Sequence, residues 1–174
     1  MPAMTYSFRK ALPEDAANVA ALAIQVWLHT YARTGIRRAI ADYVLQQFTE
    51  ENFRRQIASD PQYFILCESE GHLVGYLRLD FEAPCPDEPD IDTEIVTLYV
   101  QEHFLGKGLG AKLLEEADRV LSARGKRHAW LGVNHQNLPA IRFYEKQGLR
   151  RGGSTYFEFE GEQHENFIYI RSAG

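Results

Sequence analysis

The 174-residue sequence lacks the features that mark several classes of protein. Its two cysteines, Cys67 and Cys85, are too few for a disulfide framework and do not have the spacing of a metal site. Its net charge is −5, whereas a nucleic-acid-binding protein needs a basic face for the phosphates. No apolar run approaches the roughly 20 residues of a membrane span, and none near the N-terminus resembles a signal peptide. We therefore expect a cytoplasmic protein with a single domain over residues 1–174, and with no nucleic acid, membrane or metal as partner.

The sequence does contain a succession of strand and helix patterns that indicates a mixed α/β sheet with helices on both faces. Asn137 is the expected N-cap of the last helix, and Gly125 and Gly148 are expected to follow helix C-termini. The three consecutive strands in the middle exclude a strict strand–helix alternation. We expect strands near residues 6–11, 63–69, 71–81, 93–100, 127–133, 150–160 and 164–170, and helices near 12–32, 36–57 with a break at 48–49, 109–124 and 137–148.

An acidic, proline-rich segment, EAPCPDEPDID at residues 82–92, separates two of these strands. Its three prolines indicate a loop. Its carboxylates form either a solvated face or a surface that attracts a polycation and speeds its arrival. The acids of the loop and of the strand that follows it are Glu82, Asp87, Glu88, Asp90, Asp92 and Glu94.

Glycines at alternate positions, Gly106, Gly108 and Gly110, connect a strand to a helix. Such a turn points free backbone N–H groups at one spot, and with the helix dipole that spot is an anion site. Lys107 and Lys112 would be unfavourable at a helix N-terminus unless an anion arrives with a ligand. The alternative is a tight turn with two solvated lysines.

Two familiar phosphate-binding motifs do not fit this turn. A P-loop has Ser or Thr after Gly-Lys, and here Gly108 follows Lys107. A dinucleotide fingerprint has a third glycine where this sequence has Ala111, and an acid about twenty residues on, where Trp130 and Leu131 stand.

The stretches LYVQEHFLGKGLGAKLLEEA and WLGVNHQNLPAIRFYEKQGL, in this order, resemble the GNAT superfamily of acyl-CoA-dependent N-acyltransferases. The pyrophosphate loop of that family has Gln or Arg, two variable residues, Gly, one variable residue, then Gly or Ala. Gly108 and Gly110 match its end, whereas Leu105 departs from the Gln or Arg position. Because much of the phosphate binding in this family comes from backbone N–H groups, the departure implies weaker affinity rather than lost function. The resemblance covers Glu94–Leu149 strongly and the whole chain in element order.

The resemblance implies the GNAT acyl-CoA N-acyltransferase fold, with a central, mostly antiparallel seven-stranded sheet that is splayed between its fourth and fifth strands, near 93–100 and 127–133. It also implies acetyl-CoA as cosubstrate, bound in that gap, and no metal. Asn137 would contact the cofactor as well as cap its helix. The expected cofactor-binding residues are Leu98, Tyr99, Val100, Leu105, Gly106, Lys107, Gly108, Leu109, Gly110, Ala111, Asn137 and Tyr144.

Transfer of an acyl group to an amine requires that an ammonium group of pKa about 10 lose a proton and that the leaving thiolate gain one. By the resemblance, Tyr144 is the candidate acid, with packing beside Phe143 as the alternative. Glu94 is the candidate base, directly or through water, or a holder of the cationic amine, or simply an exposed strand acid. His135 and His29 are weaker candidates, since each also fits an exposed position.

Loose cues resemble the bacterial polyamine N-acetyltransferases within the superfamily, among them Trp27, Thr30 and Tyr31 in the first helix and the ending GGSTYFEFEGEQHENFIYI. They favour a primary amine of a polyamine as acceptor, attacking acetyl-CoA directly in a ternary complex, with Trp27, Tyr31 and Glu94 binding it. Other acceptors stay open: an amino acid, an antibiotic amine, or a protein N-terminus or lysine. A non-catalytic acyl-CoA-binding sensor is the alternative from another class. A homodimer is common in this family and compatible with the sequence.

Overall fold

The computed structural model describes residues 3–174, which fall into two compact units. The first unit runs to Arg78 and resumes at Thr97–Leu114; the second comprises Leu79–Val96 and Glu115–Gly174. The boundary therefore crosses one strand after Val96 and one helix after Leu114. Among the described residues, no helix combines the length and the apolar character that a bilayer crossing requires.

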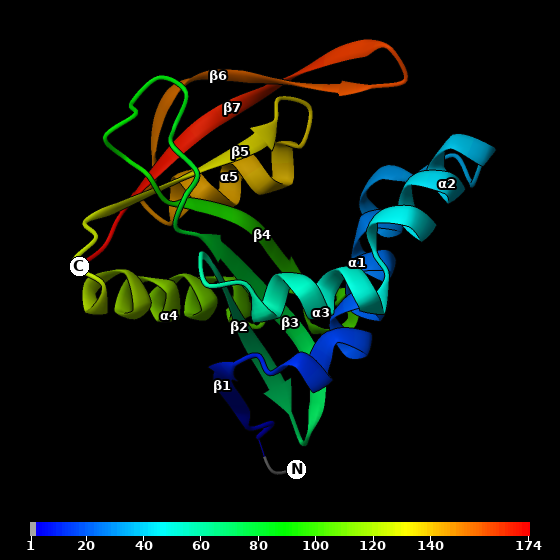
Figure 1. Ribbon diagram of the computed structural model, residues 1–174, viewed down its shortest axis with the longest axis horizontal. Helices are drawn as coiled ribbons and strands as arrows, with labels where there is room; N and C mark the ends of the chain where they lie inside the picture. The colour runs from blue at the N-terminus through cyan, green and yellow to red at the C-terminus, as the bar shows by residue number, and fades with distance from the viewer. Residues whose placement is uncertain (1–2) are drawn as a thin grey trace. The chain divides into compact units, whose positions relative to one another are not determined.

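Seven strands form one sheet in the order β1-β2-β3-β4-β5-β7-β6 (Figure 1). The β1–β2, β5–β7 and β6–β7 pairs are antiparallel, and β4 pairs with β5 in parallel, with Glu94 opposite Trp130. The predicted mostly antiparallel seven-stranded sheet is confirmed. The strands are β1 Tyr6–Lys10, β2 Gln62–Ser69, β3 His72–Asp80, β4 Glu94–Val100, β5 His128–Asn134, β6 Arg150–Phe159 and β7 Glu162–Ser172.

The helices that flank the sheet begin and end close to the predicted positions. The expected break at 48–49 is present, because Thr49 caps a new helix by accepting the amide of Asn52 at 3.0 Å. The first helix opens as a 3₁₀ turn at Pro13 rather than as α-helix. The helices are η1 Pro13–Asp15, α1 Ala16–Tyr31, α2 Arg38–Gln47, α3 Glu50–Ala58, η2 Glu102–Phe104, α4 Leu109–Ala123 and α5 Leu138–Lys146.

Three helix caps predicted from single residues are confirmed. The side chain of Asn137 accepts the amide of Ala140 at the start of α5. Gly125 and Gly148 follow α4 and α5 with φ of 72° and 84°, a region that glycine enters without the penalty of a Cβ atom.

The core of the first unit packs α1 and α3 against β2 and β3; Figure 1 shows α3 running along these strands. Phe64 and Tyr76 stack with ring centroids 5.9 Å apart, and Phe53 meets each of them edge-on. Tyr76 is 1% exposed, and its burial raises the pKa of the phenol far above its usual range. The ring of Tyr99 on β4 lies against Tyr76, so the strand that is expected to hold the cofactor rests on this aromatic core.

The core of the second unit takes in part of the acidic loop. Cys85 and Ile91, from that loop, are buried with Trp130 of β5 and with two isoleucines of β7. The indole N–H of Trp130 donates to the carbonyl of Ala83 at 2.7 Å. The Cys85 thiol donates to the carboxylate of Asp87 at 3.1 Å, and burial raises its pKa. The loop is therefore folded against the sheet on its own buried side chains.

Candidate functional site

The glycine turn of the first unit, residues 105–111, connects η2 to α4. Leu105 is extended and 58% exposed, and Gly106 and Gly108 both have φ of 76°. The amide of Lys112 donates to the carbonyl of Gly108 at 3.1 Å, and Leu109 is 2% exposed and anchors the turn. Because the first N–H groups of a helix lack intrahelical acceptors, the amides just before Lys112 are available to an anion.

A Cβ atom added at Gly106 or Gly108 would meet nothing within 4 Å. Glycine is therefore required here by the backbone conformation, and the space over the turn is open to a ligand. Lys107 is exposed beside this space. The other expected lysine, Lys112, instead places its ammonium 5.9 Å from the centre of the Tyr6 ring, an attraction between a cation and an aromatic face.

The end of β4 was expected to bind the cofactor through its backbone, and Leu98, Tyr99 and Val100 are half-buried there. The sequence analysis missed Gly75 of β3, which lies against this segment. A Cβ atom at Gly75 would stand 2.8 Å from the carbonyl oxygen of Tyr99. A glycine inside a strand signals such a close backbone approach, and Gly75 is the residue that permits it.

Gly75→Ala is therefore expected to destabilise the protein by about 1–3 kcal/mol, because the methyl group must push the Tyr99 carbonyl aside. Urea denaturation measures the effect. The matched control is Gly132→Ala in β5, where the nearest atom to an added Cβ is an ordinary 3.6 Å away. We expect the control to change stability by less than about 1 kcal/mol, and equal losses in the two variants would contradict the crowding at Gly75.

Three aromatic side chains gather where α1 and α2 meet. Trp27 lies 5.0 Å from Tyr31 and stacks on Tyr43 at 4.9 Å between ring centroids. Tyr31 is 49% exposed, and Trp27 and Tyr43 are half-buried. The structure thus brings together the two expected acceptor-binding residues and adds Tyr43, which the sequence did not single out because its contact with Trp27 is between helices. Aromatic faces of this kind attract a cationic amine.

His29, a weaker candidate from the sequence, is 2.9 Å from a carboxylate oxygen of Glu102, measured from its Nδ1 atom. The pair connects α1 to η2, immediately before the glycine turn. We therefore assign His29 to holding this segment.

Glu94 and Tyr144 both belong to the second unit. Glu94 is the first residue of β4, half-buried and opposite Trp130 in the sheet. The amide of Trp130 donates to the carbonyl of Thr93 at 2.9 Å, and Thr93 is fully buried. The backbone that carries the Glu94 carboxylate is thus fixed on its N-terminal side.

Tyr144 projects from α5, the helix that Asn137 caps. Its ring is half-buried, 5.3 Å from Phe143 and 6.4 Å from Tyr169. Its carbonyl accepts the amide of Leu149 at 3.1 Å, which closes the helix. The sequence expected Phe143 to be the more buried aromatic, but both are half-buried.

His135 lies in the turn after β5, half-buried rather than exposed, with its ring 6.1 Å from that of Phe167. Its amide donates to the carbonyl of Glu165. This position indicates a packing role in the second unit.

Three carboxylates of the acidic loop are engaged within the second unit. Asp87 accepts the amide of Gly153 at 2.5 Å, and the hydrogen bonds from Cys85 and from this amide hold its pKa below the usual range. Glu88 pairs with Arg150 at 2.8 Å, and Asp92 with Lys126 at 2.6 Å. Each of these three acids fastens the loop, so the loop presents less negative charge to a polycation than its sequence suggested.

In the described part of the chain, no group of three or more His, Cys, Asp or Glu side chains could hold a metal ion. The chemical groups that stand out are therefore the turn amides, the aromatic cluster of Trp27, Tyr31 and Tyr43, the Glu94 carboxylate and the Tyr144 phenol.

Comparison with known proteins places this set of residues in a family context. The model of the acetyltransferase (GNAT) family matches residues 23–149. An uncharacterised N-acetyltransferase of Archaeoglobus fulgidus is 31% identical over 136 residues, which are 75% of this chain and 88% of its own. The spermidine N(1)-acetyltransferase of Thermoplasma acidophilum is 24% identical over 151 residues, which are 84% of this chain and 89% of its own.

The fold has a close counterpart among crystal structures. The PaiA N-acetyltransferase of Thermoplasma acidophilum, solved in complex with coenzyme A, superposes with a TM-score of 0.75. The two chains are 22% identical, and the match covers 97% of this chain and 99% of the other.

Proposed function

The chain belongs to the acetyltransferase (GNAT) family of acyl-CoA-dependent N-acetyltransferases, and we propose that it acetylates a primary amine of a small cation, with polyamines as the first candidates. The two units would work as one N-acetyltransferase domain over residues 1–174. The family match supports this, since residues 23–149 run through both units.

The observation that carries the proposal is the geometry of the glycine turn. Gly106 and Gly108 hold the backbone in a left-handed conformation at the N-terminus of α4, where the amides suit the diphosphate of coenzyme A. A related fold was crystallised with coenzyme A. We propose that residues 105–111 bind the diphosphate, that the backbone of Leu98–Val100 binds the pantetheine arm in a splay between β4 and β5, and that Asn137 also contacts the cofactor.

In the proposed reaction the acceptor nitrogen attacks the thioester carbonyl of acetyl-CoA in a ternary complex. The new C–N bond forms as the C–S bond breaks, so the amine must lose a proton and the thiolate must gain one. We assign the first task to the carboxylate of Glu94, directly or through water. We assign the second to the phenol of Tyr144, whose neutral form is the abundant one at neutral pH.

The acceptor assignment is supported by the aromatic cluster of Trp27, Tyr31 and Tyr43. Stacked and partly exposed rings favour an aliphatic chain that carries positive charge, because they offer both apolar area and an electrostatically negative face. Glu94 would add a carboxylate for the cationic nitrogen. The similarity to a spermidine acetyltransferase agrees with this acceptor class.

A panel of amines tests the proposal. With acetyl-CoA, the purified protein is expected to release the coenzyme A thiol fastest with spermidine or spermine, as measured with a thiol-reactive dye. Amino acids, an aminoglycoside and a lysine peptide are the comparison acceptors. The highest kcat/KM with one of these would keep the N-acetyltransferase reaction and reject the polyamine.

The sensor alternative is favoured by one observation, the exposed Leu105 at a position where the family has Gln or Arg. A sensor would bind acetyl-CoA and release no thiol with any amine. Calorimetric titration with acetyl-CoA, run beside the panel, separates this outcome from a protein that does not bind the cofactor.

A further inference from the structure

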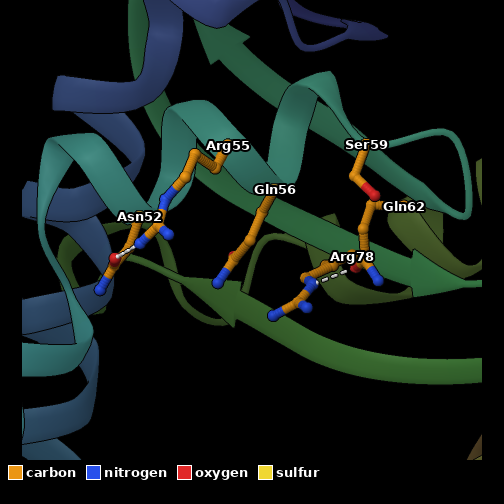
Figure 2. A pocket seen from close by; sticks show the side chains of 6 residues that line it. All are labelled: Asn52, Arg55, Gln56, Ser59, Gln62 and Arg78. Atoms are coloured by element: carbon orange, nitrogen blue, oxygen red, sulfur yellow. Dashed lines mark hydrogen bonds between the residues drawn. The ribbon is translucent and has the colours of Figure 1, made fainter.

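A polar pocket of about 370 Å³ opens on the first unit, away from the residues discussed so far. Figure 2 shows its side chains converging from α3, from the start of β2 and from β3. The volume falls within the range of small-molecule sites. The lining residues are Asn52, Arg55, Gln56, Ser59, Gln62 and Arg78.

Two guanidinium groups flank this pocket, each oriented by an amide side chain (Figure 2). The Nε atom of Arg78 donates to Oε1 of Gln62 at 2.6 Å, and an Nη atom of Arg55 donates to Oδ1 of Asn52. Among the described residues, the side chains that line the pocket include no carboxylate. In a chain of net charge −5, this is a local concentration of positive charge fixed in direction, as a bidentate site for an oxyanion requires.

Gln56 lies between the two arginines and carries the second observation (Figure 2). Its Oε1 atom is buried and has no hydrogen-bond partner among the described residues. A buried acceptor without a donor is costly, and native proteins rarely leave one so. A ligand that supplies an O–H or N–H group at this point would satisfy it.

We propose that this pocket binds a small oxyanion that also carries a hydroxyl donor, as hydrogen phosphate and α-hydroxycarboxylates do. The oxyanion oxygens accept from the guanidinium groups of Arg55 and Arg78, and the hydroxyl donates to Oε1 of Gln56. The site is separate from the glycine turn, and it does not depend on the proposed acetyl transfer.

The test follows the arginine side-chain Nε–H signals of the isotope-labelled protein by NMR while inorganic phosphate is added at constant ionic strength. Saturable shifts of the Arg55 and Arg78 signals are expected. Sulfate, which lacks a hydroxyl at neutral pH, should bind at least about fivefold more weakly. Glycolate compared with acetate repeats the contrast for carboxylates, and the tighter of phosphate and glycolate identifies the source of the oxyanion.

Matched variants separate the pocket from general charge effects. Arg55→Gln should weaken phosphate binding by at least about tenfold. Arg54→Gln removes the adjacent arginine, which pairs with Glu50 instead of lining the pocket, and should change binding by less than about twofold. Gln56→Leu should abolish the preference for phosphate over sulfate. Phosphate bound at the glycine turn would shift the amides of that turn instead.

Two results would overturn the proposal. One is a shift that does not saturate, or that is lost equally in Arg54→Gln and Arg55→Gln, since this describes an ion atmosphere. The other is equal binding of sulfate and phosphate by the unaltered protein, since this removes the role of Gln56. The second comparison needs no variant, so it holds even if a substitution prevents folding.

Discussion

Tyr144→Phe is expected to lower kcat by about 10²-fold or more, because the variant keeps the ring and removes the proton that the leaving thiolate would take. The affinity for acetyl-CoA should stay within about threefold, since the ring contacts with Phe143 and Tyr169 do not involve the hydroxyl. Steady-state kinetics with the best amine of the panel, together with calorimetry for acetyl-CoA, measure the two quantities separately.

The matched control for this substitution is Tyr156→Phe. Tyr156 is 61% exposed on β6, and its variant should retain the full rate. An unchanged rate in Tyr144→Phe would assign Tyr144 to packing, which was the alternative from the sequence. A loss of affinity without a loss of kcat would make it a cofactor-binding residue only.

Gly108→Val should weaken acetyl-CoA binding by about 10²-fold. A β-branched residue at φ of 76° is strained, and its side chain would fill the open space over the turn amides where the diphosphate is expected to lie. Calorimetric titration with coenzyme A measures the loss. At saturating cofactor kcat should largely recover, because the substitution changes none of the proposed proton-transfer groups.

Gly161→Val is the control for strain alone. Gly161 has φ of 77° and equally open surroundings, but it lies in the turn between β6 and β7. The two variants should lose similar amounts of folding free energy, and coenzyme A affinity should fall in Gly108→Val alone. Equal affinities in both would remove the glycine turn from the cofactor site.

Local chemistry explains what could be predicted from the sequence. Thr49, Asn137 and Gly125 act within a few residues of themselves, so their caps and the breaks between helices can be recognised without tertiary information. The order of strands and helices follows from hydrophobic periodicity over short windows. The glycine turn was recognisable for the same reason, because it depends on the conformation of consecutive residues.

The features that were missed depend on residues far apart in the chain. Gly75 matters because of the Tyr99 carbonyl, and Tyr43 because it stacks on Trp27. The acidic loop shows the same limit, since the partner of Glu88 is 62 residues away. Periodicity and spacing do not encode such pairings, so a carboxylate that fastens a loop and one that attracts a substrate look alike in the sequence.

The burial of both cysteines has a practical consequence for spectroscopy. Cys67 and Cys85 are 0% and 1% exposed, and burial raises the pKa of Cys67 to about 11, so neither presents a reactive thiolate at neutral pH. A single cysteine introduced at an exposed position such as Lys107 would therefore take up a maleimide fluorophore selectively. Conformational change at that position can be followed by fluorescence in a protein that keeps its native cysteines.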